Sequence, residues 1–246
     1  MKQYRFFTTA DVIQSDNVIE YTKASKKVLA STNSEGKNVF EQVKTWLPQA
    51  AKVYHISPDL NDYILVNMCI MCSDLPNRNA VAFPLTELTS FNPDTGCLGY
   101  QTWIGKPTFE EHHNDILENA KGVIFDAYMM DAPEYEGDIA KVYLLTGWDK
   151  TKDPALCQKI LSGERNCYSM GSYSEDFKCS ICGKLMTKGG CEHSNPNNPH
   201  MEIVDGKLAF SNVVGMNGFE LSSVGVPAFC MAESDKVIDI SEDIKQ

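Results

Sequence analysis

Residues 153–172 read DPALCQKILSGERNCYSMGS, a helix signal followed directly by a strand signal. Asp153 can cap a helix, and Pro154 occupies its first position, where a missing backbone N–H costs little. Apolar residues recur behind them at helical spacing, and Gly163 is placed to end the helix. The residues at 166–172 are typical of a short strand. The sequence therefore predicts a helix joined by a short connection to a strand.

Most of the remaining chain carries strand signals, which are short apolar or alternating runs separated by Gly, Pro and Asp. These runs are residues 61–71, 99–104, 121–128, 140–145, 207–214 and 219–226. An earlier helix is expected at 37–51, ending near Pro48. Many short strands with few helices predict a mixed α+β domain that is mainly β, or a β-barrel-like domain.

Length, charge and hydropathy exclude several classes of protein. The chain has 246 residues, enough for one sizeable domain with embellishments or at most two. Its net charge of −11, with scattered basic residues, argues against a nucleic-acid partner. The N-terminus lacks the apolar core of a secretory signal, and no apolar run approaches the roughly 20 residues of a membrane helix. We therefore expect a cytoplasmic protein without a membrane partner.

A cysteine-rich insert at about 176–200 has the spacing of a metal site. Its potential ligands are Cys179, Cys182, Cys191 and His193, with His200 as an alternative fourth ligand. Structural Zn²⁺ prefers four tetrahedral thiolate or imidazole ligands, and a full set leaves no position for a catalytic water. The insert has few apolar residues, so a metal can supply its order. Free thiols in a loop, or a redox pair, are the alternatives.

A second pair, Cys69 and Cys72, lies in a dense apolar run with no further pair nearby. Residues three apart on a strand point to opposite faces, so we expect these thiols to be part of the buried core. Nucleotide-binding loops, the H-E-x-x-H zinc motif and the G-x-S-x-G elbow are all absent from the sequence. Nucleotide chemistry, zincin chemistry and an α/β-hydrolase are therefore not supported.

Three blocks of sequence contain candidate groups for serine chemistry, in which a hydroxyl needs a neighbouring base. The blocks read GKPTFEEHHN at 105–114, followed by AKGV at 120–123; ILSG at 160–163, followed by YSMG at 168–171; and FELSSVGVPA at 219–228. Taken singly, these residues need no catalytic role, because the histidines fit ordinary surface residues and the serine fits an ordinary strand residue. Taken together and in order, the blocks resemble the prohead (head maturation) protease family of tailed bacteriophages, which is related to the herpesvirus assemblins.

The resemblance implies a role for each matching residue. Ser169 would be the nucleophile and His112 the general base, with His113 as the alternative base. His112 is preferred because its spacing to the flanking residues matches the family block. Glu220 is favoured as the residue that orients the imidazole, with Asp126 as the alternative. Backbone amides would stabilise the oxyanion.

The resemblance covers about half of the chain, and it also implies a fold and a setting. The fold would be a herpesvirus-protease-like barrel at 99–232 with flanking helices and a small zinc-binding insert. Residues 1–98 match none of the blocks, and we expect them to pack on this domain or belong to it. The composition of residues 233–246 predicts an acidic, polar tail, in which 237–240 fits a short strand or an unstructured segment. The protein would process phage scaffold and major capsid proteins, and itself, within the prohead or virion in the host cytoplasm.

Two other readings are compatible with the sequence. A virion head or neck component can retain the protease-like fold without its chemistry, because fold and function separate. A zinc-dependent protein-binding module would explain the insert but neither Ser169 nor His112. A homo-oligomer is compatible with each of these readings, and the cleavage preference is not encoded in any recognisable motif.

Overall fold

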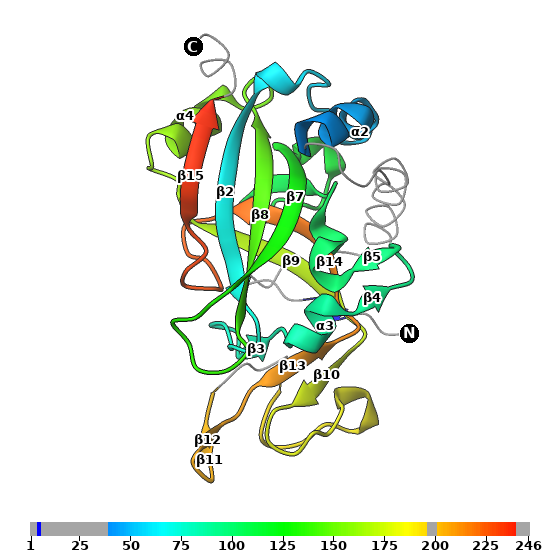
Figure 1. The fold of residues 1–246 in the computed structure, drawn as a ribbon, viewed down its shortest axis with the longest axis vertical. Helices are drawn as coiled ribbons and strands as arrows, with labels where there is room; N and C mark the ends of the chain where they lie inside the picture. Colours follow the sequence, from blue (N-terminus) through cyan, green and yellow to red (C-terminus); the bar gives the residue numbers. More distant parts are fainter. Residues whose placement is uncertain (1–3, 6–38, 196–200, 240–246) are drawn as a thin grey trace.

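A computed structural model describes residues 4–5, 39–195 and 201–239 of the chain (Figure 1). Within these residues the protein is a mixed α/β fold that consists mostly of strands. Its three α-helices are α2 (Val39–Tyr54), α3 (Leu85–Thr89) and α4 (Pro154–Leu161). Short 3-10 turns are η1 (Leu60–Asp62), η2 (Gly99–Trp103), η3 (Leu117–Asn119) and η4 (Met186–Lys188).

An eight-stranded sheet forms the body of the molecule, in the order β1-β9-β14-β6-β7-β8-β2-β15. In that order the strands are Tyr4–Arg5, Tyr168–Ser174, Asn217–Ser223, Pro107–Glu110, Gly122–Asp131, Ala140–Asp149, Tyr63–Cys72 and Ser234–Asp239. All neighbours are antiparallel except β14 and β6, which run parallel. We expected a barrel, but the described strands form an open sheet, since the edges β1 and β15 each pair with a single neighbour among them.

Three smaller sheets surround the main one. β10 (Asp176–Cys179), β13 (Ser211–Val214) and β3 (Val81–Ala82) form one sheet at the lower end of Figure 1. The other two are the pairs β11 (Ile203–Val204) with β12 (Lys207–Leu208), and β4 (Phe91–Asn92) with β5 (Cys97–Leu98). The predicted strand at 207–214 is therefore two short strands that belong to different sheets.

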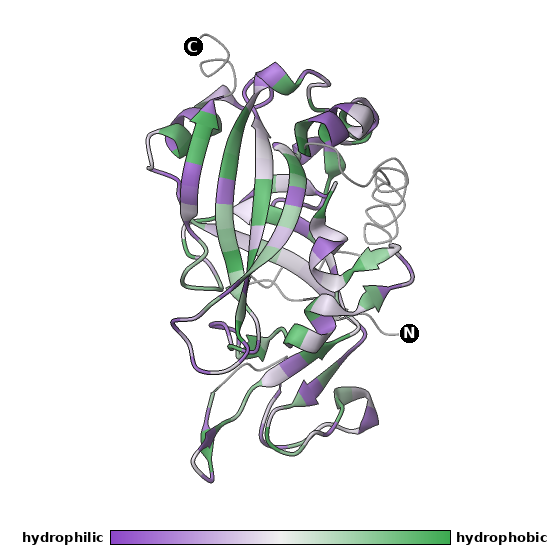
Figure 2. Cartoon of the chain, viewed as in Figure 1, coloured by the Kyte–Doolittle hydropathy of each residue, from purple (hydrophilic) through white to green (hydrophobic). Residues whose placement is uncertain are grey.

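Two hydrophobic cores meet at β2. Ile64, Val66 and Met68 contribute to one core, whereas Tyr63 and Leu65 contribute to the other, together with α2. Alternate residues of a strand face opposite sides, so a strand that is buried on both faces is apolar throughout. Figure 2 shows this hydrophobic run along β2. β2 comes from the first 98 residues, yet it lies between β8 and β15 inside the main sheet.

The helix predicted at 37–51 is present, but its expected end near Pro48 is wrong. α2 continues through Pro48 to Tyr54. Its buried stripe includes Trp46, and Tyr54 donates a hydrogen bond of 2.8 Å to the carbonyl of Gly105. We attribute the continuation of the helix to this packing, which offsets the loss of the backbone hydrogen bond that proline cannot donate.

The helix and strand predicted at 153–172 are confirmed. The Asp153 side chain accepts a hydrogen bond of 2.9 Å from the backbone N–H of Leu156, and α4 starts at Pro154. Gly163 has a φ of 77°, a conformation that suits glycine after a helix end. By contrast, the strand predicted at 99–104 is wrong. The residues form the turn η2, because Trp103 is buried over Gly218 of β14.

A β-bulge in β2 changes the orientation expected for Cys69 and Cys72. Their partners on β8 are Tyr143 and Lys141, which are two residues apart and share one face of the sheet. The register shifts between Cys69 and Met71, so both cysteines lie on that same face. Both are buried, as expected, but the prediction of opposite faces is wrong.

Part of the expected polar tail is a strand. β15 pairs antiparallel with β2, and Val237 packs against the main core. Residues 240–246 lie outside the described part of the chain. No helix in the described part is long and apolar enough to cross a membrane.

Candidate functional site

Ser169, Ser222 and Glu220 form a polar row on one face of the main sheet. Ser169 on β9 lies opposite Ser222 on β14. Residues that face each other across an antiparallel pair point to the same side, with Cβ atoms about 5 Å apart. Glu220 precedes Ser222 by two residues and therefore shares this face. Ser169 is 5% exposed, and the other two side chains belong to fully buried residues.

A strained turn directs His112 at this row. β6 ends at Glu110, and the next residues, Glu111 and His112, have φ values of 49° and 57°. Residues other than glycine rarely adopt this left-handed conformation, which persists only where the surroundings hold it. Nδ1 of His112 lies 2.9 Å from Oε1 of Glu220, and both side chains are buried. The turn therefore brings an imidazole onto a buried carboxylate.

Ser222 engages both members of this pair. Its hydroxyl donates a hydrogen bond of 2.7 Å to Oε2 of Glu220. The hydroxyl oxygen of Ser222 also accepts a hydrogen bond of 3.2 Å from the backbone N–H of His112. Buried carboxylates are costly unless their oxygens find donors, and here each oxygen of Glu220 has a close polar partner.

Gly171 makes room for the Glu220 carboxylate. It lies opposite Glu220 on β9, two residues after Ser169. A Cβ atom at Gly171 would lie 2.6 Å from Oε1 of Glu220 and 2.7 Å from a ring carbon of Phe219. Its carbonyl accepts a hydrogen bond of 3.1 Å from the indole of Trp103. The glycine that follows Ser169-Met170 is therefore a steric requirement of the site.

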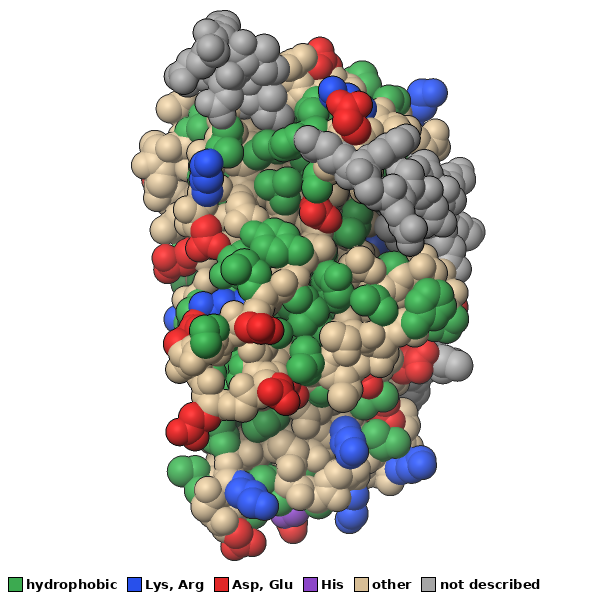
Figure 3. Space-filling model, in the orientation of Figure 1, with side chains coloured by type: hydrophobic (Ala, Val, Ile, Leu, Met, Phe, Trp, Pro, Cys, Tyr) green, Lys and Arg blue, Asp and Glu red, His purple; other side chains and the backbone are tan. Residues whose placement is uncertain are grey.

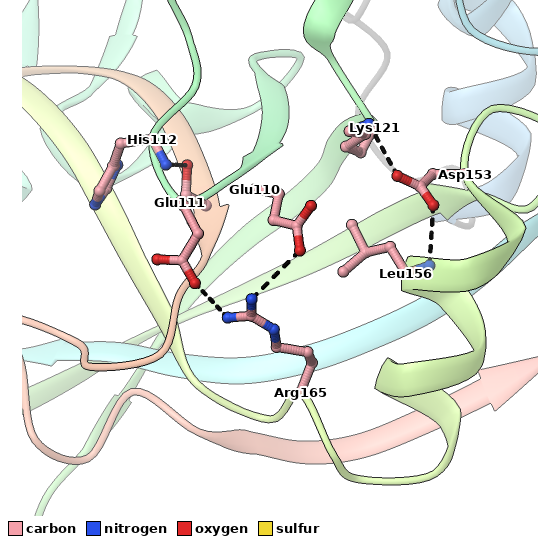
Figure 4. A network of polar contacts seen from close by, with 8 residues as sticks. Glu110, Glu111, His112, Lys121, Asp153, Leu156 and Arg165 are labelled. Carbon is pink, nitrogen blue, oxygen red and sulfur yellow. Dashed lines mark hydrogen bonds and ion pairs between the residues drawn. The ribbon is translucent and has the colours of Figure 1, made fainter.

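Arg165 joins the connection before β9 to the turn that carries His112. Figure 4 shows its guanidinium group between the carboxylates of Glu110 and Glu111. The hydrogen bond to Glu111 raises the pKa of Arg165 further above its usual value. The ion pairs are partly exposed, so their contribution to stability is modest. Figure 4 also shows Asp153, which bridges Lys121 and the first turn of α4.

The structure places the two alternative residues elsewhere. His113 follows His112 but is exposed, and its backbone N–H bonds to the carbonyl of Glu110 at 2.9 Å. Asp126 lies on β7, two strands away from β14, and burial raises the pKa of its carboxyl group. Among the predicted residues, the fold thus gathers Ser169 on β9, Glu220 on β14 and His112 in the turn after β6.

The arrangement brings together the three kinds of group that serine hydrolysis uses, a hydroxyl, an imidazole and a carboxylate. A carboxylate that accepts the Nδ1 proton fixes the imidazole tautomer and leaves Nε2 to act as a base. An imidazole in that state can activate a serine hydroxyl that lies within its reach. Ser169 is the serine on the same face that has some exposure to solvent, whereas Ser222 has none. The face therefore carries a serine hydroxyl, an imidazole and a carboxylate, with the imidazole held by the carboxylate.

A second cluster, at the lower end of the molecule, can bind a metal ion. The ligand atoms of Cys179, Cys182, Cys191 and His193 all lie within 4.8 Å of one another. Cys179 ends β10, and its sulfur accepts a hydrogen bond of 3.3 Å from a backbone N–H in the turn that follows. Figure 3 shows Lys and Arg side chains around this end of the molecule.

The donor atoms of this cluster fit a metal. Nδ1 of His193 is buried and has no hydrogen-bond partner among the described residues. Burial favours the neutral thiol of Cys179, but hydrogen bonds from Ser194 and from nearby backbone amides outweigh it and lower its pKa to about 6. A thiolate is the form that binds metals. The alternative ligand His200 lies outside the described residues.

Comparisons with family models, with curated proteins and with solved structures find no match to this chain. The relationship to the prohead proteases therefore stays a prediction that rests on the three sequence blocks.

Ser222 and Arg165 are two residues of the site that sequence reasoning missed. Glu220 and Ser222 are two apart in a predicted strand, so their shared face could have been noticed. The position of Arg165 between two acids depends on how α4 and β6 are placed in space, and no local signal in the sequence indicates it.

Proposed function

We propose that the chain is a serine endopeptidase in which Ser169 is the nucleophile, His112 the general base and Glu220 the orienting acid. One observation carries the proposal. The buried hydrogen bond of 2.9 Å between Nδ1 of His112 and Oε1 of Glu220 lies on the sheet face that Ser169 shares. A histidine backed in this way by a carboxylate can act as the base for a serine hydroxyl within its reach, and Ser169 is the serine that we propose for that role.

The proposed reaction uses these three side chains. Oγ of Ser169 attacks the carbonyl carbon of the scissile peptide bond while Nε2 of His112 accepts the hydroxyl proton. Glu220 holds the imidazole ring and stabilises the imidazolium ion that forms. His112 then gives the proton to the leaving amine, and a water molecule activated by the same imidazole hydrolyses the acyl-enzyme. Backbone amides supply the oxyanion donors.

The proposed substrates are phage scaffold and major capsid proteins and the chain itself, processed inside the prohead. This substrate class comes from the resemblance of the three blocks. Its structural support is that the blocks supply adjacent strands, with β14 lying between β6 and β9. On the same ground we propose that the open sheet is a variant of the herpesvirus-protease fold.

Co-expression with a candidate scaffold or capsid protein tests the proposal. We expect the wild-type chain to shorten the partner and itself, and Ser169→Ala to abolish both events without loss of folding. A His113→Ala variant is the matched control, because its side chain is exposed, and it should retain cleavage. Cleavage that persists in Ser169→Ala would contradict the proposal. Intact chains present at full stoichiometry in mature particles would favour a structural role in the virion.

We also propose that the Cys/His cluster holds structural Zn²⁺. Three thiolates and one imidazole are a common tetrahedral zinc set, and four protein ligands leave no open position for catalysis. Metal analysis of protein purified without chelators should give close to one zinc per chain. A content below roughly half an equivalent would count against the site, since structural zinc binds tightly.

A further inference from the structure

We infer that Ser222 is a positioning residue of the proposed active site, holding both the His112 backbone and the Glu220 carboxylate. The inference rests on the proposed function and extends it to a residue to which the resemblance assigns no role. Ser222 acts through its two neighbours and does not contact the substrate itself.

The hydrogen bonds of Ser222 support this role. Its hydroxyl donates to Oε2 of Glu220 at 2.7 Å and accepts from the backbone N–H of His112 at 3.2 Å. Glu220 in turn binds the ring of His112 through its other oxygen. The histidine is thus held at its backbone and at its ring, and Ser222 takes part in both restraints.

The strain in the turn makes the backbone restraint important. His112 and its predecessor Glu111 both have left-handed φ values, a conformation that non-glycine residues keep only when other contacts hold it. The bond to Ser222 is one such contact. Without it, the N–H of His112 loses this acceptor, and the turn gains freedom to relax towards ordinary backbone angles.

Burial separates the role of Ser222 from that of a nucleophile. Ser222 is 0% exposed, whereas Ser169, directly opposite it on β9, is 5% exposed. The Ser222 proton is directed into the Glu220 carboxylate, so this hydroxyl is oriented away from attack. The same side chain can therefore support the site without competing for the substrate.

The next residue, Ser223, provides a matched control. It is also 0% exposed and lies on the same strand, but it faces the other side of the sheet. Its hydroxyl oxygen has no hydrogen-bond partner among the described residues. Ser223→Ala removes the same atom from an equally buried position without touching the pair of His112 and Glu220.

The test uses a fluorescent alkyl phosphonofluoridate and the full chain. Oγ of Ser169 attacks phosphorus, the P–O bond forms, the P–F bond breaks and fluoride leaves, while His112 takes the hydroxyl proton. The rate of this step reports the activation of Ser169 and needs no knowledge of the natural substrate. Labelling is followed over probe concentration to separate the maximal rate from the half-saturating concentration, and thermal unfolding is recorded in parallel.

We expect Ser222→Ala to lower the maximal rate by about tenfold or more, because a buried hydrogen bond to a charged group is lost. The half-saturating probe concentration should change little, and Ser223→Ala should label like the wild type. Ser222→Thr keeps the hydroxyl group and should recover much of the rate. If Ser222→Ala does not fold, Ser222→Cys, with its weak S–H donor, replaces it and should also label slowly.

The possible outcomes separate the two proposals. A wild-type chain that is not labelled at Ser169 would overturn the proposed function itself. The role of Ser222 alone would be overturned by a different result: the wild type is labelled, and Ser222→Ala or Ser222→Cys reacts as fast as Ser223→Ala. Equal slowing in Ser222→Thr and Ser222→Ala would likewise refute it, since the hydroxyl would then not be what matters.

Discussion

A single methyl group added at Gly171 of β9, the strand that carries Ser169, should disable the proposed active site. In Gly171→Ala the new Cβ would lie 2.6 Å from Oε1 of Glu220, the oxygen that contacts His112, and 2.7 and 2.8 Å from two ring carbons of Phe219. To reach an ordinary contact, the carboxylate oxygen has to move by roughly 0.8 Å. A shift of this size can lengthen the bond to His112 from 2.9 Å beyond the limit of about 3.5 Å.

The expected cost follows from two effects. Overpacking of a well-filled interior destabilises a protein by about 1–3 kcal/mol. A loss of roughly 2 kcal/mol lowers the unfolding midpoint of a chain of this size by about 4–8 °C. The proposed catalysis should suffer more. In another serine protease, replacing the carboxylate that orients the histidine lowered the rate by roughly 10⁴-fold. We expect labelling of Ser169 by a phosphonofluoridate to slow by about 100-fold or more, since displacement is milder than removal.

Thermal unfolding and labelling kinetics check this prediction together. Gly225→Ala is the control, because the nearest heavy atom to its added Cβ is 3.8 Å away and its φ is ordinary. It should leave both measurements close to those of the wild type. If Gly171→Ala unfolds within 1 °C of the wild type, roughly the resolution of such measurements, and labels at the same rate, the packing of Glu220 over Gly171 is not what holds His112.

Two further predictions concern the metal cluster and the cap of α4. Cys182→Ser should release most of the bound zinc and destabilise the insert, whereas Cys230→Ser, at another exposed cysteine, should keep the metal; equal metal content in both would contradict the ligand assignment. Burial favours protonation of Asp153, but hydrogen bonds from Lys121 and from the Leu156 backbone lower its pKa below 3.8. Its stabilising effect is therefore complete above about pH 4 and lost as the pH falls through the lower folded value. Asp153→Asn keeps a capping side chain and should reduce the fall in the free energy of unfolding as the pH is lowered below about 4. An unchanged fall in the variant would show that Asp153 does not contribute to it.

The elements that the sequence predicted well are those set by local chemistry. The cap at Asp153, the proline that follows it and the glycine at 163 place α4 within one residue or two. β2 is equally clear, since its residues are apolar on both faces. The errors arise where tertiary contacts override local signals. α2 passes through Pro48 because its buried face continues to Tyr54, and η2 replaces a strand because Trp103 packs over Gly218.

The candidate site was predicted only in part for the same reason. The sequence ranked His112 above His113 from block spacing, whereas Glu220 and Asp126 each lie in a matched block and Glu220 was only the favoured candidate. The structure separates them by position, since His113 is exposed and Asp126 lies two strands away from β14. The contribution of Ser222 depends on the parallel pairing of β14 with β6, which joins residues more than 100 positions apart. Such a register is set by the whole sheet, so no local pattern reveals it.

The most direct test of the central claim is to locate the phosphonate adduct by peptide mass spectrometry. The wild-type chain is predicted to carry one adduct, on Ser169. The Ser169→Ala variant is predicted to carry none. His112→Ala should react far more slowly while His113→Ala reacts normally. An adduct on another residue, or labelling that does not depend on His112, would contradict the assignment of Ser169 as a nucleophile activated by this histidine.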